Sequence, residues 1–364
     1  TGGMTSQAYG QRNLNEVARI LVRSLAVAAA VAAALIVLQV PIRQAALDIM
    51  SPTADVRRYA ETYIAILIWG APAMLGLYSF TGWFIGMQNS RLPMIIAITQ
   101  NVVNIAASLA FVYLMGMKVE GVALGTLVAQ YAGLLMAVIA WATTYSRLCR
   151  HFSRSGLFGR AMEKFFSVNR DIFLRTLCLI SVMLFFTSAG SRQGETVLAV
   201  NALLMQFYMM FSYIMDGFAY AGEAISGKRY GAGNHKALRE TVSTLFRWGA
   251  GMTLGFTLAY ALGGEAFVSL LTSDRSVILA SQEYLFWAVL MPMAGVAAFV
   301  WDGVFIGCTM TGGMLRSMFG ATIAFFGVYF VARSSMGNHG LWLAFTLYMA
   351  MRGAIQTIIW GKRR

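Results

Sequence analysis

Long apolar segments recur along almost the whole of this chain, and they constrain its fold more than any other feature. Each is long enough for an α-helix to cross about 30 Å of hydrocarbon, whereas barrel strands would read as alternating segments of about ten residues. Hydrophobic residues make up 58% of the 364 and charged residues only 12%, which a soluble core could not cover. The sequence therefore predicts an all-α polytopic membrane protein. We expect ten spans, at about residues 14–40, 59–86, 92–116, 121–145, 169–190, 196–227, 241–264, 281–307, 315–333 and 340–361.

The basic residues give a net charge of +13, but their distribution argues against nucleic-acid binding. When the gaps between spans are numbered alternately, 21 of the 28 lysines and arginines fall on one side of the membrane. That asymmetry is the positive-inside signature, so we expect both ends of the chain in the cytoplasm, with basic loops attracted to anionic lipid. In this tally Arg23, Arg175 and Arg352 count with the cytoplasmic side.

The chain also repeats itself at an offset of 221 residues, the separation of Gly82 and Gly303. The first of these glycines opens Gly-Trp-Phe-Ile-Gly and the second opens Gly-Val-Phe-Ile-Gly. Each repeat holds an even number of helices, so the halves should share one orientation about an axis along the membrane normal. The sequence thus predicts two pseudo-symmetric six-helix bundles. Further matches within two residues of this offset are Tyr9-Gly10 with Tyr230-Gly231, Tyr63 with Tyr284, Pro72 with Pro292, and 121–125 with 340–344.

The repeat register predicts the domain boundaries. We expect an N-terminal bundle at 1–145, a cytoplasmic linker at 146–168 and a C-terminal six-helix bundle at 169–364. The second repeat has two spans before its Tyr-Gly pair, whereas the first has only a short polar segment. We therefore expect about 60 to 80 further N-terminal residues in the intact protein, carrying one helix and most of a second, so that about ten of twelve helices are present here.

Three carboxylates lie inside segments that otherwise read as membrane: Asp216, Glu223 and Asp302. A charge at bilayer depth costs at least about 2.5 kcal/mol, so such a group faces a protein interior or a water-filled cavity. We expect these residues to form the ion-coupling and substrate cavity. Asp302 could exchange a proton, or hold sodium if oxygen atoms surround it. The structural alternative for each is a hydrogen bond or ion pair that fixes helix packing.

Asp216 and Glu223 are seven residues apart and share one face of a predicted helix. Met209, Tyr213 and Tyr220 continue that face, and aromatic rings and sulfur suit flat lipophilic cations. Several amides are further candidates either to line a cavity or to hold helices together, namely Asn101, Asn104, Asn201 and Gln206. Two prolines near the middle of equivalent spans are candidate hinges, Pro72 and Pro292.

These motifs carry a family resemblance. The segments TGGMTSQAYGQRN, EGVALGTLVAQ, DGFAYAGEAISGKRYGAGNHKA and WDGVFIGCTMTGGMLRSM resemble a multidrug and toxic compound extrusion (MATE) transporter of the DinF-like branch. The resemblance covers essentially the whole chain and implies a bacterial inner (plasma) membrane location. In that branch it also implies an important proton-linked carboxylate on the first helix, which we expect among the further N-terminal residues of the intact protein.

The expected function is secondary antiport: lipophilic, cationic drugs leave as protons or sodium ions enter, and two bundles alternate in access. The alternative is a flippase for lipid-linked precursors, whose anionic substrate calls for basic residues inside the spans. A membrane enzyme is a third hypothesis that no glycine-flanked aspartate motif supports, and no nucleotide motif suggests direct coupling to ATP. We expect a monomer without cofactor or metal site beyond the coupling ion, with a small-molecule drug and membrane lipid as its partners and no nucleic acid.

Overall fold

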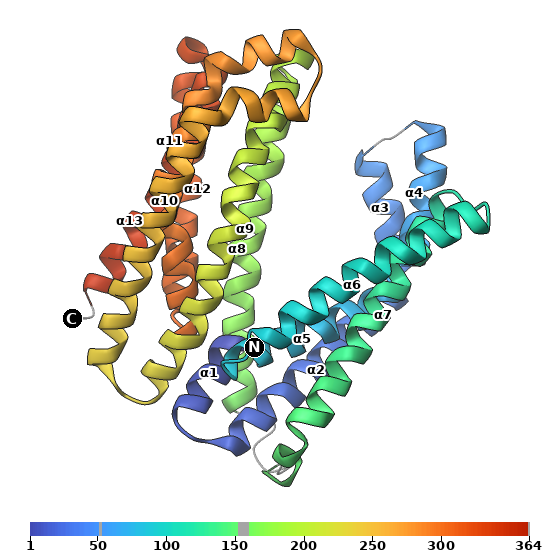
Figure 1. Ribbon diagram of the computed structural model, residues 1–364, viewed down its shortest axis with the longest axis vertical. Helices are drawn as coiled ribbons and strands as arrows, with labels where there is room; N and C mark the ends of the chain where they lie inside the picture. The colour runs from blue at the N-terminus through green and yellow to red at the C-terminus, as the bar shows by residue number, and fades with distance from the viewer. Residues whose placement is uncertain (51–52, 152–159, 363–364) are drawn as a thin grey trace. The chain divides into compact units, whose positions relative to one another are not determined.

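The computed structural model describes residues 1–50, 53–151 and 160–362, and within these ranges the chain is almost entirely helical (Figure 1). Its contacts divide it into two compact units, Thr1–Gly159 and Arg160–Arg364. The division falls inside the segment expected as a linker, of which residues 152–159 lie outside the described part. Helix α8 begins at Arg160, so the last nine residues expected as linker are helical.

The first unit contains a short helix followed by the first four expected spans. Its elements are α1 (Gly2–Gly10), α2 (Leu14–Val37), α3 (Gln39–Met50), α4 (Ala54–Leu67), the 3-10 turn η1 (Ile68–Gly70), α5 (Ala71–Gly86), α6 (Arg91–Leu109), the π-turn η2 (Ala110–Leu114), α7 (Val119–Thr144) and the 3-10 turn η3 (Ser146–His151). Helix α5 packs against α1, α2 and α7, so its apolar residues form the core of this unit. Helices α1 and α3 were not anticipated as helices, because neither is long enough to span a bilayer.

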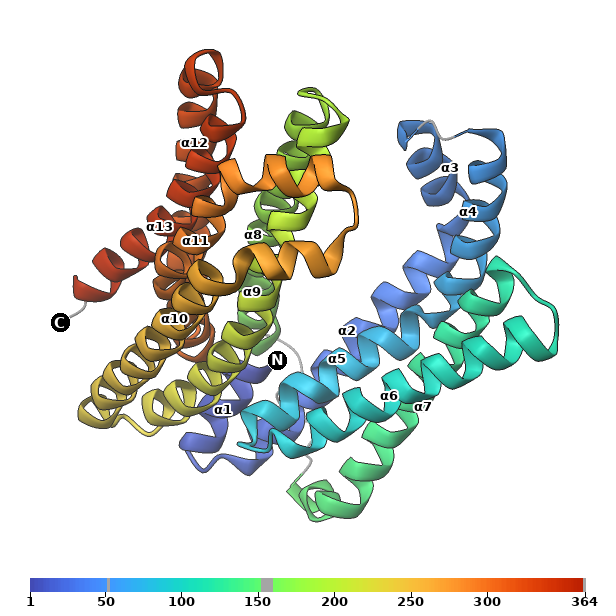
Figure 2. The same cartoon turned by 45° about the horizontal axis from the view of Figure 1, so that its top comes forward.

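The second unit consists of six long helices. They are α8 (Arg160–Ser191), α9 (Glu195–Gly231), α10 (His235–Leu271), α11 (Arg275–Gly307), α12 (Thr311–Met336) and α13 (Asn338–Gly361). Figure 2 shows α11 among α9, α10 and α13, and it packs against all three. Helix α11 is the most buried of the spans and therefore forms the centre of this unit.

Nine helices in the described residues are long and apolar enough to cross a membrane, one fewer than the ten spans expected. The tenth, α13, is a helix of 24 residues but lies outside that set. Its hydropathy is lowered by polar residues that the unit buries, chiefly Arg352 and Gln356, which are 2% and 1% exposed. Helix α13 is thus a central helix whose polar groups are covered by protein.

The internal repeat extends to the turn geometry within each unit. Asn13 and Asn234, 221 residues apart, each begin a helix, and each side chain accepts a hydrogen bond from the backbone N–H three residues on, at 3.1 and 3.0 Å. Gln88 and Thr309, again 221 apart, both take positive φ values of 65° and 51°. Non-glycine residues rarely adopt this conformation. The two units are therefore built by the same local rules.

The two expected hinge prolines have different surroundings. Pro72 lies in the first turn of α5, directly after η1, so a 3-10 turn interrupts the span from Ala54 to Gly86 at this point. Pro292 lies inside the continuous α11 and is buried. Proline fits the first turn of a helix without losing a hydrogen bond, whereas inside a helix it removes one. Whether either position bends during a transport cycle stays a prediction.

A buried amide cluster joins α9 to α13. Asn201 and Asn338 each donate to the other's Oδ1 at 2.9 Å, and the Nε1 of Trp342 donates to the Oδ1 of Asn201 at 2.8 Å. All three side chains are less than 5% exposed. Of the two interpretations open for Asn201, the structure shows the one in which the amide holds helices together.

Replacing Asn201 with leucine is expected to lower the free energy of unfolding by about 2–3 kcal/mol, because Asn338 and Trp342 lose their partner while remaining buried. The measurement is the temperature at which half of the detergent-solubilised protein aggregates. The matched control is Asn101→Leu on α6, whose exposed amide, in the part of the chain that the structure describes, bonds the carbonyl of Ala97 in its own helix. We expect the control to change stability by less than about 0.5 kcal/mol, and equal shifts for both variants would contradict the assignment.

Candidate functional site

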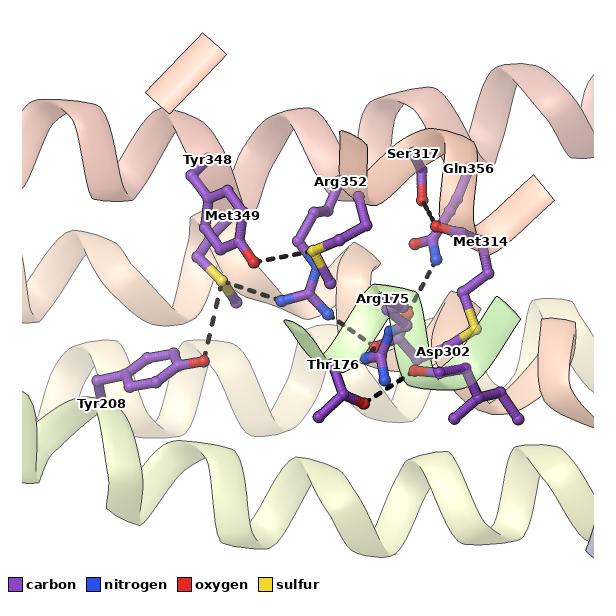
Figure 3. Close-up of polar contacts among 12 residues, drawn as sticks. Arg175, Thr176, Tyr208, Asp302, Met314, Ser317, Tyr348, Met349, Arg352 and Gln356 are labelled. Carbon is purple, nitrogen blue, oxygen red and sulfur yellow. Dashed lines mark hydrogen bonds and ion pairs between the residues drawn. The ribbon is translucent and has the colours of Figure 1, made fainter. Parts of the chain in front are cut away.

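A charged cluster lies inside the second unit, centred on Asp302 of α11 (Figure 3). The Asp302 side chain is 9% exposed. Oδ2 accepts hydrogen bonds from Arg175 of α8 and, at 2.7 Å, from Nη2 of Arg352 of α13. Oδ1 accepts a hydrogen bond of 2.8 Å from Nε2 of Gln356, also of α13. One carboxylate thus connects three helices.

Local sequence explains how α13 reaches this carboxylate. Arg352 and Gln356 are four residues apart and therefore share one face of the helix. Between them lies Gly353, where a Cβ would stand 2.6 Å from the Cβ of Ala297. The absence of a side chain at this position lets α13 approach α11 closely, which places both polar side chains at Asp302.

Sulfur and aromatic groups surround the rest of the Arg352 guanidinium. Its Nη1 lies 3.4 Å from the sulfur of Met349, and its Cζ lies 5.6 Å from the ring centre of Tyr348. The Tyr348 hydroxyl contacts the sulfur of Met318 at 2.9 Å. Polarisable sulfur and a π-face offer a guanidinium weak but favourable contacts where water is excluded.

Two buried polar atoms of the cluster do not form hydrogen bonds with any residue that the structure describes. Within the described part of the chain, Nε of Arg175 and Oε1 of Gln356 are buried without a hydrogen-bond partner. Two guanidinium groups also face a single carboxylate. Asp216 of α9 lies within electrostatic range of Asp302, Arg175 and Arg352. Removal of one partner from a buried ion pair typically costs about 3–5 kcal/mol of stability. We therefore expect the loss of any one of these charged side chains to leave the others in an unfavourable environment.

Three of the arginines counted with the cytoplasmic side form ion pairs with carboxylates from within the expected spans or at their ends. Arg352 lies in α13 and Arg175 in α8, and Arg23 lies in α2, where it is 3% exposed and bonds Glu16 at 2.7 Å. Beside the three predicted carboxylates, the spans of the second unit therefore also hold two arginines, Arg175 and Arg352. The sequence contains a signal for these two residues, because Arg175 and Arg352 fall within the spans expected at 169–190 and 340–361. An arginine there is as costly as a carboxylate and needs the same explanation.

The other two predicted carboxylates, Asp216 and Glu223, both lie on α9. Asp216 is half-buried, while Glu223 is 9% exposed and its backbone oxygen would lie 2.5 Å from a Cβ at Gly307 of α11. Tyr213 and Tyr220 on the same face are 73% and 52% exposed. The face is therefore left open by its own bundle. Met209 is half-buried and packs against the core of this unit.

The second group of predicted cavity residues is dispersed. Asn104 of α6 donates to Thr126 of α7 at 3.2 Å and so joins two helices of the first unit. Asn101 and Gln206 are exposed. The three amides are thus divided between the two units. Within the described residues, histidine, cysteine and carboxylate side chains form no group of three that could hold a metal ion.

Comparisons with known proteins identify one matching family model and several related sequences. The MatE family model matches residues 1–110 and 172–332. The chain is 35% identical to DNA damage-inducible protein F of Escherichia coli (strain K12), in an alignment that covers 100% of this chain and 79% of that protein. It is 25% identical to human multidrug and toxin extrusion protein 1, over 93% of this chain and 60% of that protein.

Solved structures agree at the level of the fold. A crystal structure described as MATE in the straight conformation matches with a TM-score of 0.87 at 19% identity, covering 100% of this chain and 82% of that one. At so low an identity the likeness establishes the helical arrangement alone.

Proposed function

Because the chain belongs to the MatE family of multidrug and toxin extrusion transporters, we propose that it is a secondary antiporter of the bacterial inner membrane that exports lipophilic cations in exchange for protons or sodium ions. The observation that supports ion coupling is the carboxylate of Asp302, whose side chain is 9% exposed and bonded to side chains of α8 and α13.

In this proposal an ion that binds Asp302 changes the ion pairs that connect α11 to α8 and α13. A proton on Oδ2 removes the negative charge that holds both guanidinium groups, so Arg175 no longer links α8 to α11. Among the described residues, Arg352 then retains its contacts with the sulfur of Met349 and the ring of Tyr348. The electrostatic tie between three helices is thus present or absent according to the charge of one carboxylate, which is the kind of two-state element that alternating access requires.

The surroundings of Asp302 fit a proton better than a sodium ion. A hard cation needs several oxygen ligands, whereas the side chains that contact Asp302 present nitrogen donors. The oxygen atom available next to them is the unpartnered Oε1 of Gln356. We therefore propose protons as the coupling ion at this carboxylate.

The open face of α9 supports a cationic, flat substrate. The half-buried carboxylate of Asp216 lies between the exposed rings of Tyr213 and Tyr220 along one helix face. Aromatic faces and a carboxylate together attract lipophilic cations. Since Asp216 also interacts electrostatically with Asp302, a bound cation and a proton on Asp302 would disfavour each other.

Purified full-length protein in sealed proteoliposomes tests this proposal, with ethidium fluorescence as the readout while a pH gradient or a sodium gradient is imposed separately. We expect ethidium movement with the pH gradient and little with sodium alone. Movement driven by sodium alone would contradict the assignment of the proton, and no movement under either gradient would contradict cation antiport.

The second candidate is a flippase for anionic, lipid-linked precursors. The observation that favours it is the excess of guanidinium groups over carboxylates at Asp302, since Arg175 and Arg352 could pair with an anionic substrate. Translocation of a fluorescent anionic lipid in the same vesicles, without ethidium movement, would support this alternative.

A further inference from the structure

A groove of about 370 Å³ lies at one end of the second unit, apart from the Asp302 cluster. Arg239, Ser243 and Phe246 of α10 form one side, Trp301 of α11 forms the floor, and Thr357 and Trp360 of α13 form the other side. Helix α10 begins at His235 and α13 ends at Gly361. The span expected at 241–264 begins between Arg239 and Phe246, and the span expected at 340–361 ends beside Trp360, so we expect the groove at the level of the lipid headgroups.

Aromatic rings form the wall of this groove. The Trp301 ring lies 5.0 Å from Phe246 and 5.2 Å from Trp360, measured between ring centres. The Trp301 Nε1 donates to Thr357 at 2.7 Å, which fixes the orientation of the indole. Tryptophan is typical of the headgroup level of a membrane, where apolar and polar contacts meet.

The polar side of the groove offers unused donors. Arg239 and Ser243 are one turn apart on α10, both are exposed, and within the described residues neither makes a hydrogen bond or ion pair. This is unusual for a helical hydroxyl, because Thr241 and Thr244 on the same helix each bond a backbone carbonyl four residues earlier. A guanidinium and a hydroxyl at this spacing can hold one phosphate group together.

We propose that this groove binds an anionic phospholipid, with its phosphate on Arg239 and Ser243 and an acyl chain against Phe246 and Trp360. The charge near the groove agrees, since Lys236 and Lys362 stand at the same helix ends. A lipid fits better than a soluble anion because the donors lie at the edge of a groove of about 370 Å³ whose wall is aromatic, close to the expected bilayer boundary. Basic pockets between spans are known to bind such headgroups.

Lipid in this groove would also support the charged cluster. Trp301 precedes Asp302 in α11, and Thr357 follows Gln356 in α13. The bonds from Trp301 to Thr357 and from Gln356 to Asp302 therefore join the same two helices at neighbouring positions. A bound lipid that holds α10, α11 and α13 together would favour the arrangement in which Asp302 is bonded.

Native mass spectrometry of the full-length protein, released from micelles with equal amounts of phosphatidylglycerol and phosphatidylcholine, tests the proposal without any transport measurement. We expect one phosphatidylglycerol to be retained preferentially, and we expect Arg239→Gln to weaken its binding about fivefold to tenfold. The matched control is Arg316→Gln, which removes the same charge from an exposed residue in the first turns of α12. The control should retain the lipid like the wild type.

Each remaining outcome would overturn the proposal. Equal retention of the two lipids would mean that the groove does not select an anionic headgroup. An equal loss in the Arg239 and Arg316 variants would mean that the attraction is spread over the basic surface. A second measurement guards against misfolding: Ser243→Ala should leave the aggregation temperature unchanged and still lower phosphatidylglycerol retention.

Discussion

The variant Asp302→Asn is expected to lose ion-driven ethidium transport by more than tenfold and to lower the free energy of unfolding by about 3 kcal/mol. The loss of transport follows from the proposed role of the carboxylate, because an amide cannot exchange a proton. The loss of stability follows from the geometry, since Arg175 and Arg352 both bond Oδ2 and would remain as uncompensated charges. Proteoliposome transport and the aggregation temperature of the detergent-solubilised protein measure the two effects.

A second substitution separates the two effects. Adding Arg352→Gln to Asp302→Asn removes one of the unpaired charges, so we expect part of the stability to return while transport stays absent. The matched control is Asp171→Asn on α8, a carboxylate that is 7% exposed and accepts a hydrogen bond of 3.0 Å from Thr311. We expect the control to transport at no less than half the wild-type rate. Recovery of transport in the double variant would show that Asp302 serves packing alone.

The architecture was predictable because apolar length and repeat register leave few alternatives. The expected start of the span at 281–307 differs from that of α11 at Arg275, but its end at Gly307 agrees. The turn that follows has the same backbone conformation in both units, and the Gly-x-Phe-Ile-Gly repeat marks its position in the sequence. The repeated motif therefore predicts the end of this helix accurately, whereas its expected start lies six residues too late.

The charged cluster was predictable only in part. Asp302 was identified because a carboxylate in an apolar segment is costly wherever it lies. Arg175 and Arg352 were missed because arginine also marks cytoplasmic loops, and a count of basic residues does not distinguish the two roles. The pairing itself depends on contacts between residues 127 and 50 positions apart in the chain, which no local pattern contains. The partner of a buried charge is a property of helix packing.

The second large effect is expected at Gly303, the residue after Asp302. A Cβ there would lie 2.1 Å from the backbone oxygen of Ala219 and 2.7 Å from its Cα, so α9 and α11 cross with their backbones in contact. Backbone atoms cannot move aside as a flexible side chain can. We therefore expect Gly303→Ala to force the two helices apart and to lower the free energy of unfolding by about 3 kcal/mol, at the upper end of the usual overpacking cost.

The matched control, Gly251→Ala in the exposed part of α10, should act in the opposite direction. No atom lies within 4 Å of a Cβ at that position, and alanine loses less backbone entropy than glycine when a helix forms. We expect it to raise stability by up to about 1 kcal/mol. Aggregation temperatures of the two variants test the contrast, and a shift of the same sign in both would contradict it. Because Asp302 depends on the same crossing for its position, Gly303→Ala should also reduce transport, whereas Gly251→Ala should not.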